Sequence, residues 1–406
     1  MNLKSKLPPK FQKYASLGVL PKLFLLPFAL AFVLIIFAAR PIAQIRIFRI
    51  NPWRLGHLGI EVELVRLNAI HRSKWKKSHI IFYFPERRTA NVFFSNFWQR
   101  SLPSIKGIWG WLVYEIAFKI NEHSLTVEPT LIDFHGLFQI YPSNLRFTSL
   151  EEKLGEKFLE EIDCKSKDYV CLIVRDSSYL DQIRPEKKFD WYNYRDSDIE
   201  RYLSASEVLT TRGFTVLRMG HIVAEKLQSP NPKVIDYATN GMRSEFLDLF
   251  LGANCKMCIT TDTGFDAIPR IFRRPTFYVN LLPIFPKWTV VQPTIQYPKT
   301  LIKGDRSLTL KEIIAYDLAS AEHDSVYNES GITIRDLSSE ELVEAVTEMA
   351  QRVECTFVET PEQKEMQAKL KHILSTHPKL QPTPNHYPIR AEFASCFLSR
   401  YPNFLD

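Results

Sequence analysis

The stretch from Cys255 to Asn280 carries the residue types and the order of a phosphate-binding turn. A short apolar run (CKMCIT) predicts a strand, a loop of small residues follows, and a helix is expected to begin near Phe265. Gly264 lets the backbone come close to a ligand, and the unpaired N–H groups of the helix start would point at the loop. Such a turn suits the phosphates or ribose of a nucleotide, although an ordinary strand–helix turn capped by Thr263 has the same pattern. The loop residues assigned to the phosphates are Thr261, Asp262, Thr263 and Gly264.

Charged residues follow two further apolar runs at what should be the same sheet edge. The runs at 168–174 and 214–217 predict buried strands, and an arginine stands just past the end of each. Ligands of open α/β sheets bind at this edge, and the planar arginine fork suits a diphosphate, unless it pairs with a carboxylate at the surface. Ser244 and Glu245 begin a nearby helix; Glu245 could accept ribose hydroxyls or simply favour the helix start. The strand-end candidates are Arg175, Asp176, Arg218 and Gly220.

Two histidines are candidate general bases. Arg54 and His57 follow an alternating run at 45–50 (IRIFRI) that predicts a first strand, and His135 follows a run at 131–134 that could be a third strand. Histidine is suited to the role because its ordinary pKa lies near neutral. A single histidine can equally be a structural residue, so both assignments stay open.

Several catalytic motifs are absent from the sequence. There is no GxxxxGK[ST] loop, no GxGxxG after a strand, no GxSxG and no HExxH, which disfavours P-loop kinases, nicotinamide dehydrogenases, serine hydrolases and zinc proteases. Cys255 and Cys258 form a CxxC, but no second CxxC completes a zinc site. We therefore expect no cofactor and no essential metal, and we interpret the cysteines as free thiols in a reducing compartment.

Composition and charge set wide bounds. The chain has 406 residues, 45% hydrophobic and 24% charged, which is ordinary for a globular protein long enough for two domains. A net charge of +7 allows an anionic partner such as a nucleotide, a phospholipid or a lipid diphosphate. We expect no nucleic acid, because the sequence has neither a zinc-finger nor an RNP pattern.

The residues from Leu23 to Ala39 predict a membrane element. This run of 17 residues has no charge, which is near the lower limit for a spanning helix, and basic residues stand on both sides. It could span the membrane once, or it could lie in one leaflet with its basic flanks at anionic lipid, which we favour. A buried core helix is the third interpretation.

The rest of the chain alternates apolar runs with helical segments. This alternation at short intervals predicts a parallel, doubly wound sheet. The expected helices lie at 59–70, 149–167, 198–212, 243–253, 338–352 and 390–400; further strands are expected at 79–84, 234–237, 255–260 and near the end of the 255–280 stretch.

Eight stretches, in their order and spacing, resemble a family of bacterial glycosyltransferases found in surface-polysaccharide and capsule gene clusters. They cover nearly the whole chain after the apolar run, and it is their order that is specific. They are RLGHL at 54–58, LIVRDSSY at 172–179, YRDSDIERY at 194–202, VLRMG at 216–220, VIDYA at 234–238, RSEFLDLFLGANCK at 243–256, TDTGFDAIPRIFRRP at 261–275 and FLSRYPNFLD at 397–406.

The resemblance implies an α/β, GT-B-like architecture, in which two Rossmann-like, doubly wound domains face each other across a cleft. In that fold the C-terminal domain usually binds the nucleotide-sugar and the N-terminal domain the acceptor. The segment 261–275 resembles the family's donor-phosphate loop and Arg175 its strand-end arginine, while Arg54 and His57 fall on its RxGH signature. The expected parts are a membrane segment at 1–42, an acceptor-side domain at 43–160, a donor domain at 161–355 and, at 356–406, a tether and helix returning to the first domain.

We therefore expect a metal-independent glycosyltransferase at the cytoplasmic face of a bacterial inner membrane. It would move a sugar from a nucleotide-sugar to a glycan acceptor, which we expect to be lipid-linked, with His57 or His135 taking the proton. A sugar-nucleotide epimerase on the same fold is one alternative, although it has no need of residues 23–39. A non-catalytic, membrane-tethered protein of polysaccharide assembly is the other, and it predicts no nucleotide binding.

Overall fold

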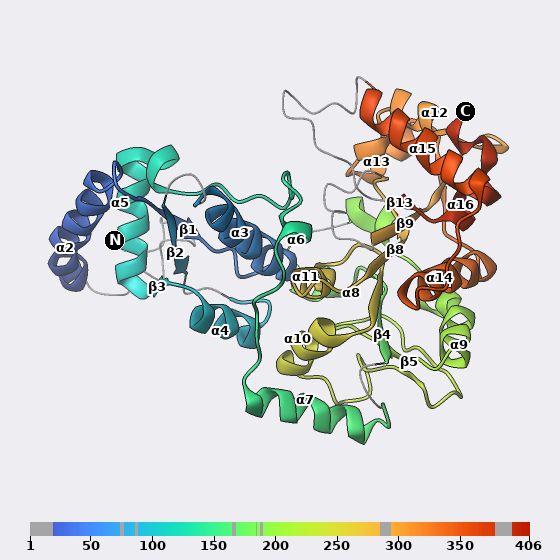
Figure 1. The fold of residues 1–406 in the computed structure, drawn as a ribbon, viewed down its shortest axis with the longest axis horizontal. Coiled ribbons are helices and arrows are strands. Elements are labelled where there is room, and N and C mark those ends of the chain that lie inside the picture. The colour runs from blue at the N-terminus through green and yellow to red at the C-terminus, as the bar shows by residue number, and fades with distance from the viewer. Residues whose placement is uncertain are drawn as a thin grey trace. The chain divides into compact units, whose positions relative to one another are not determined.

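The computed structural model describes residues 19–73, 77–85, 88–164, 168–183, 185–186, 190–284, 294–377 and 392–406. The chain forms two compact units, Met1–Leu131 and Ile132–Asp406. Each unit has its own parallel sheet with helices around it, and an apolar helix stands near the N-terminus (Figure 1). The expected α/β class with parallel sheets and an apolar N-terminal helix is therefore confirmed.

The first unit is built on a three-stranded sheet in the order β1-β2-β3, in which both neighbouring pairs are parallel. The third strand is not the one expected at 131–134. Those residues are irregular and lead into a helix start, where the Asp133 carboxylate accepts hydrogen bonds from the backbone N–H groups of Leu137 (2.7 Å) and Phe138 (2.9 Å). The elements of this unit are α2 (Val19–Ala38), β1 (Gln44–Arg49), a π-helix (His57–Glu61), α3 (Val62–Arg72), β2 (Ser78–Phe84), α4 (Val92–Ser101), β3 (Ser104–Lys106) and α5 (Gly107–Leu125).

The second unit is built on a seven-stranded sheet in the order β13-β9-β8-β7-β4-β5-β6, and every neighbouring pair is parallel. Its central strands are buried along their whole length, as expected for a parallel sheet that is covered on both faces. A small antiparallel sheet adjoins it. The strands are β4 (Tyr169–Ile173), β5 (Thr215–Arg218), β6 (Val234–Ile235), β7 (Met257–Thr260), β8 (Thr276–Leu281), β9 (Thr294–Pro298) and β13 (Glu392–Phe393), with β10 (Thr300–Lys303), β11 (Arg306–Ser307) and β12 (Thr333–Arg335) in the small sheet.

Helices with clear start signals cover this sheet. The helix expected at 338–352 is α14, and Ser338 and Glu341 form the capping box that its sequence predicted. The helices are α6 (Leu137–Ile140), α7 (Ser149–Glu161), α8 (Ser178–Ile183), α9 (Leu203–Thr211), α10 (Glu245–Asn254), α11 (Ala267–Ile271), α12 (Leu310–Ala315), α13 (Asp324–Glu329), α14 (Ser339–Val353), α15 (Pro361–Thr376) and α16 (Ser395–Arg400); 3₁₀ helices include η3 (Asp190–Arg195), η4 (Ile199–Tyr202) and η5 (Gly264–Asp266).

The units divide between Leu131 and Ile132, about thirty residues before the expected boundary at 160/161. The reason is that α7 and the segment before it pack on the second unit. The Phe147 ring lies 5.4 Å from that of Phe250 and stacks on Phe272 at 5.8 Å between ring centroids, and a Cβ on Gly155 would collide with Phe250. Figure 1 shows α7 beside α10.

The C-terminal residues also pack within the second unit, although we expected them to lead back to the first domain. Strand β13 adds to the sheet beside β9, and Phe397 of α16 contacts Tyr297 of β9 with 5.0 Å between ring centroids. The extended tether expected at Pro378, Pro382, Pro384 and Pro388 lies outside the described residues.

Candidate active site

The loops that follow β4, β7 and β9 meet at the carboxyl edge of the seven-stranded sheet. These strands are parallel and lie close together in the sheet, so the residues after them share one edge. The backbone N–H of Arg175, after β4, donates a hydrogen bond to the Thr261 hydroxyl, after β7, at 2.8 Å. Lys299 follows β9 at the same edge. The structure thus brings together Arg175 and the 261–264 loop, as the sequence predicted.

Three cations pair with three carboxylates at this edge. Arg175 Nε lies 3.1 Å from a carboxylate oxygen of Asp196, and Arg195 Nη2 lies 2.6 Å from one of Asp262. Lys299 Nζ lies 2.8 Å from Asp336 and donates to the backbone carbonyl of Asp196 at 2.6 Å. We call these six residues the edge cluster: Arg175, Arg195, Asp196, Asp262, Lys299 and Asp336.

Burial changes the pKa values of cations in the edge cluster. The side chains of Arg175, Arg195 and Lys299 are 13%, 17% and 3% exposed. Desolvation lowers the pKa of Lys299, against the pull of Asp336. Desolvation, with the nearby positive charge of Arg195, also lowers the pKa of Arg175. Cations that repel each other in a partly dry site favour an anionic ligand that contacts both.

Aromatic rings adjoin these cations. The guanidinium carbons of Arg175 and Arg195 lie 5.4 Å and 5.5 Å from the centroid of the Tyr192 ring, within cation–π range. The neighbouring ring of Trp191 is 37% exposed and stacks on His323 with 4.4 Å between centroids. A planar ligand group could stack on such a surface while its charged part meets the arginines.

The 261–264 loop combines an unusual backbone conformation at Asp262 with an ordinary helix cap at Thr263. Asp262 has φ = 63°, a left-handed conformation that few residues other than glycine adopt. Arg195 contacts both the carbonyl oxygen and the carboxylate of Asp262, which holds this conformation. The Thr263 hydroxyl accepts from the N–H of Phe265 at 3.3 Å and thus caps η5. The cap by Thr263 is thus observed, and phosphate binding by this loop stays a prediction.

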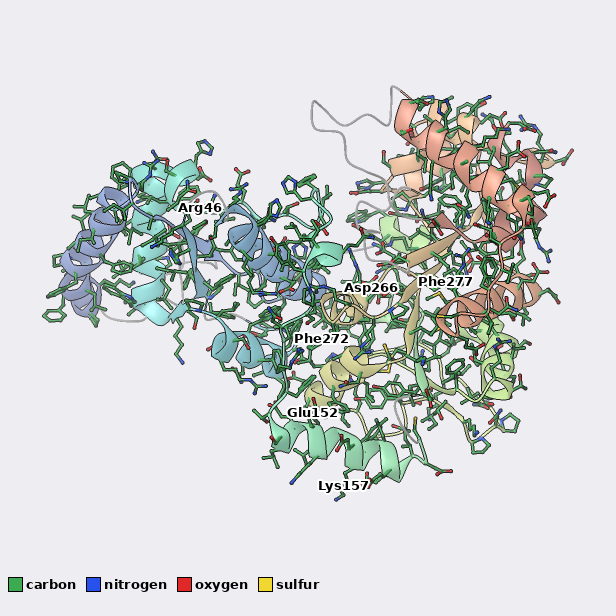
Figure 2. All side chains as sticks on the ribbon, viewed as in Figure 1. Arg46, Glu152, Lys157, Asp266, Phe272 and Phe277 are labelled. Atoms are coloured by element: carbon green, nitrogen blue, oxygen red, sulfur yellow. The ribbon has the colours of Figure 1, made fainter. Side chains whose placement is uncertain are left out.

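Asp266 lies buried just after the loop (Figure 2). Its Oδ2 has no hydrogen-bond partner among the described residues. Burial, followed by the negative charge of Asp262, raises the pKa of Asp266 to about 7. This carboxyl group is therefore close to its titration point at neutral pH.

Arg218 ends β5 at the same sheet edge, but its side chain is buried and paired with a carboxylate. It is the last residue of β5, its side chain is 1% exposed, and its Nη1 lies 3.1 Å from a carboxylate oxygen of Asp236. The Asp236 carboxylate balances the charge of Arg218 within the protein. Arg218 is therefore a buried structural ion pair.

The remaining candidates, at a strand end or a helix start, also have structural roles. Asp176 accepts hydrogen bonds from the N–H groups of Ser178 (2.9 Å) and Ala224 (3.1 Å), which ties two edge loops together. Ser244 caps α10, with Glu245 in its first turn. A Cβ on Gly220 would lie 2.6 Å from a methyl carbon of the Val223 side chain, so this glycine allows close backbone packing.

The candidate bases lie in both units. His57 begins the π-helix of the first unit, and its Nδ1 lies 2.6 Å from a carboxylate oxygen of Glu61, which is buried. Single turns of π-helix occur often at functional sites. Arg54 lies over the ring of Trp53, with 4.4 Å to its centroid. His135 is exposed and precedes α6 in the second unit.

Within the described residues no three His, Cys, Asp or Glu side chains gather as metal ligands. The sequence contains one Asp-x-Asp triplet, residues 196–198, a spacing that also occurs in metal–nucleotide sites. Its carboxylates serve different partners here, because Asp196 meets Arg175 whereas Asp198 caps η4. The absence of a metal stays a prediction.

Comparisons with known proteins found distant structural similarity only. No protein-family model matches the chain, and no curated protein matches it. Among solved structures it is similar to the ADP-heptose LPS heptosyltransferase II of E. coli, with 12% identity over 76% of this chain and 99% of that one and a TM-score of 0.41. A glycosyl transferase of family 9 from Veillonella parvula gives 13% identity, 77% and 97% coverage, and a TM-score of 0.42. A candidate UDP-N-acetylglucosamine 2-epimerase from Listeria monocytogenes gives 9% identity, 85% and 92% coverage, and a TM-score of 0.29.

Proposed function

We propose that this protein is a glycosyltransferase that moves a sugar from a nucleotide-sugar to a glycan acceptor. The observation that carries the proposal is the edge cluster, which places three partly buried cations beside a small-residue loop at the carboxyl edge of a parallel sheet. Nucleotides bind at this edge in open α/β sheets. The family resemblance of the sequence assigns the same loop to the donor phosphates.

The second unit would bind the donor. Arg175, Arg195 and Lys299 would hold the diphosphate and stabilise the negative charge that develops as it leaves the sugar. Fixed cations can supply this stabilisation without a metal ion, because they are already oriented by the protein. The rings of Trp191 and Tyr192 would contact the planar base of the nucleotide.

The first unit would bind the acceptor and supply the base. In His57 the contact of Nδ1 with Glu61 would place the ring proton on Nδ1 and leave Nε2 as the hydrogen-bond acceptor. Nε2 could then take the proton of the acceptor hydroxyl, as an imidazole oriented by a carboxylate does in other enzymes. His135, which belongs to the second unit, is the alternative candidate for this step, and Arg54 would position the acceptor.

We place the reaction at the cytoplasmic face of a bacterial inner membrane, in surface-polysaccharide synthesis, with a lipid-linked glycan as acceptor. The apolar helix α2 and the resemblance to capsule-cluster enzymes support this setting. An epimerase on the same fold would use the same edge but would not need an acceptor. The measurement that separates them is release of nucleoside diphosphate that depends on added acceptor.

Thermal shift against a panel of nucleoside diphosphates and nucleotide-sugars, without added metal, tests donor binding. A ligand that binds the folded state must raise its stability by mass action. We expect a selective shift in the unaltered protein and about a tenfold or greater loss of affinity in Arg175→Ala, since a hydrogen bond to a charged group contributes roughly 1.5–3 kcal/mol. Arg212→Ala is the matched control. Arg212 also pairs with a carboxylate, Glu354, but it stands between α9 and the start of β5, at the amino edge of the sheet and away from the edge cluster. Equal affinity in both variants would overturn the donor assignment, and no shift at all would favour the non-catalytic alternative.

A further inference from the structure

Helix α2 has two unlike faces although nearly all its residues are apolar. Ala29, Val33 and Ile36 are buried at 0–3% exposure. The opposite face carries large apolar side chains that stay exposed in the protein. They are Leu23, Phe24, Leu26, Phe28, Leu30, Leu34, Ile35 and Phe37, between 37% and 70% exposed, and Ile42 just beyond the helix is 81% exposed.

The buried face belongs to the hydrophobic core of the first unit. It packs on Leu112, Val113 and Ala117 of α5 and shares one core cluster with Ile47 of β1. Figure 1 shows α2 alongside α5. The inner face of α2 is therefore committed to the protein, and only its outer face is open to a partner.

The packing of α2 on α5 limits how α2 could bind or cross a membrane. With 20 residues α2 is about 30 Å long, enough to cross the hydrocarbon core of a bilayer. If it crossed while docked, α5 would enter the hydrocarbon with the charged residues Glu115, Lys119 and Glu122, which is costly. If it crossed alone, Ala29, Val33 and Ile36 would leave the core of the unit. Both routes to a span are unfavourable.

The charges around α2 fit an anionic surface. Lys22 precedes the apolar run and Arg40 follows it, and the first acidic residue of the whole chain is Glu61. Lys22 Nζ lies 5.8 Å from the centroid of the Trp111 ring, which is partly exposed on α5. Basic residues with tryptophan beside an apolar helix face are typical of helices that lie in the headgroup region of one leaflet.

We infer that the outer face of α2 inserts into a single leaflet of an anionic bilayer while its inner face stays in the protein core. The first unit would thus bind the membrane through a helix that lies in the plane of the bilayer, and both ends of α2 would stay on the same side of the bilayer. The inference rests on the membrane attachment proposed above but not on the transfer chemistry.

Vesicle binding of the purified protein tests the face that inserts. Phe24→Glu and Ile35→Glu change exposed side chains (70% and 66%), so both variants should fold, as circular dichroism would verify. We expect each to weaken binding to phosphatidylglycerol-containing vesicles by about tenfold or more, because a large apolar side chain loses its burial. Val358→Glu, at an 84% exposed position of the second unit, is the matched control and should bind like the unaltered protein. Unchanged binding in both α2 variants would refute the inference.

Cysteine labelling in sealed vesicles tests the topology. Pro21→Cys and Pro41→Cys place thiols at exposed positions at the two ends of α2, in a background where the exposed native Cys355 is replaced by serine. A membrane-impermeant maleimide added outside should label both positions equally before and after detergent. Labelling of one position only after detergent would mean that α2 spans the bilayer. Nucleotide thermal shifts are independent of either result, so failure here leaves the donor site untouched.

Discussion

Replacing the buried Asp266 by asparagine should stabilise the protein most strongly at alkaline pH. The side chain is 4% exposed and its Oδ2 has no hydrogen-bond partner among the described residues. Burial, and then the charge of Asp262, raise its pKa from the usual 3.8 to about 7. An acid whose pKa is higher in the folded protein ionises more readily on unfolding, so a rise in pH through this range favours the unfolded chain.

The size of the effect follows from that pKa. Between pH 5 and pH 8 a shift from 3.8 to about 7 removes about 2–3 kcal/mol of stability, since each pKa unit corresponds to about 1.4 kcal/mol. The asparagine side chain has nearly the shape of the protonated acid but does not ionise, so this loss should vanish in Asp266→Asn. For a unit of this size the difference is about 5–10 °C in Tm.

Differential scanning calorimetry at pH 5 and pH 8 measures this directly. We expect Asp266→Asn to raise the Tm already at pH 5, because an unfolded carboxyl group with the usual pKa of 3.8 is ionised there, and we expect this advantage to grow by about 5–10 °C at pH 8. Asp305→Asn makes the same change in charge at an exposed position and should show no such growth. A Tm difference that is the same at both pH values would mean that Asp266 is ionised throughout, and the reasoning from burial would be wrong.

Two further variants test packing and charge in the second unit. Gly155→Val should lower the free energy of unfolding in urea by at least about 1–3 kcal/mol, because even a Cβ at this position would lie 2.2 Å from the Phe250 ring. Leu154→Val, at an exposed neighbouring position, is the control. Equal losses of stability in the two variants would show that α7 can shift away from Phe250. Asp196→Asn should tighten binding of the nucleoside diphosphate that gives the thermal shift by about three- to tenfold in calorimetric titration, because it removes the carboxylate that competes for Arg175. Weaker binding would instead show that Asp196 holds Arg175 in place.

The parts of the fold that the sequence predicted are those in which one physical rule dominates. Strands β4 and β7 correspond to apolar runs, since a parallel strand covered on both faces must be largely apolar, and β1 corresponds to an alternating run. Helix α14 was predicted with its start, because a serine and a glutamate three residues apart satisfy the first N–H groups of a helix.

The parts that the sequence did not reveal lack such a signal. Strand β3 has three residues, too few for any alternation to show. Strand β9 (TIQYP) has only five residues, contains a glutamine and ends in proline, so its alternation is too short to indicate a strand, and the sequence does not identify Lys299 after it as an edge residue. Arg195 lies at the end of a polar 3₁₀ helix, where no periodic pattern exists. Both cations join the edge cluster only through tertiary structure, which sequence spacing does not report.

The carboxylates of the edge cluster have a consequence for any ligand of this site. A partly buried cation without a partner is costly, so Asp196, Asp262 and Asp336 make the three cations tolerable in the free protein. A diphosphate that binds there must compete with carboxylates that are already in place, and its affinity reports the difference between two sets of ion pairs. Charge alone would then discriminate poorly between anions. Selectivity for one nucleotide must come from groups that touch its uncharged parts, and the exposed ring of Trp191 is the group beside the cluster that is suited to it.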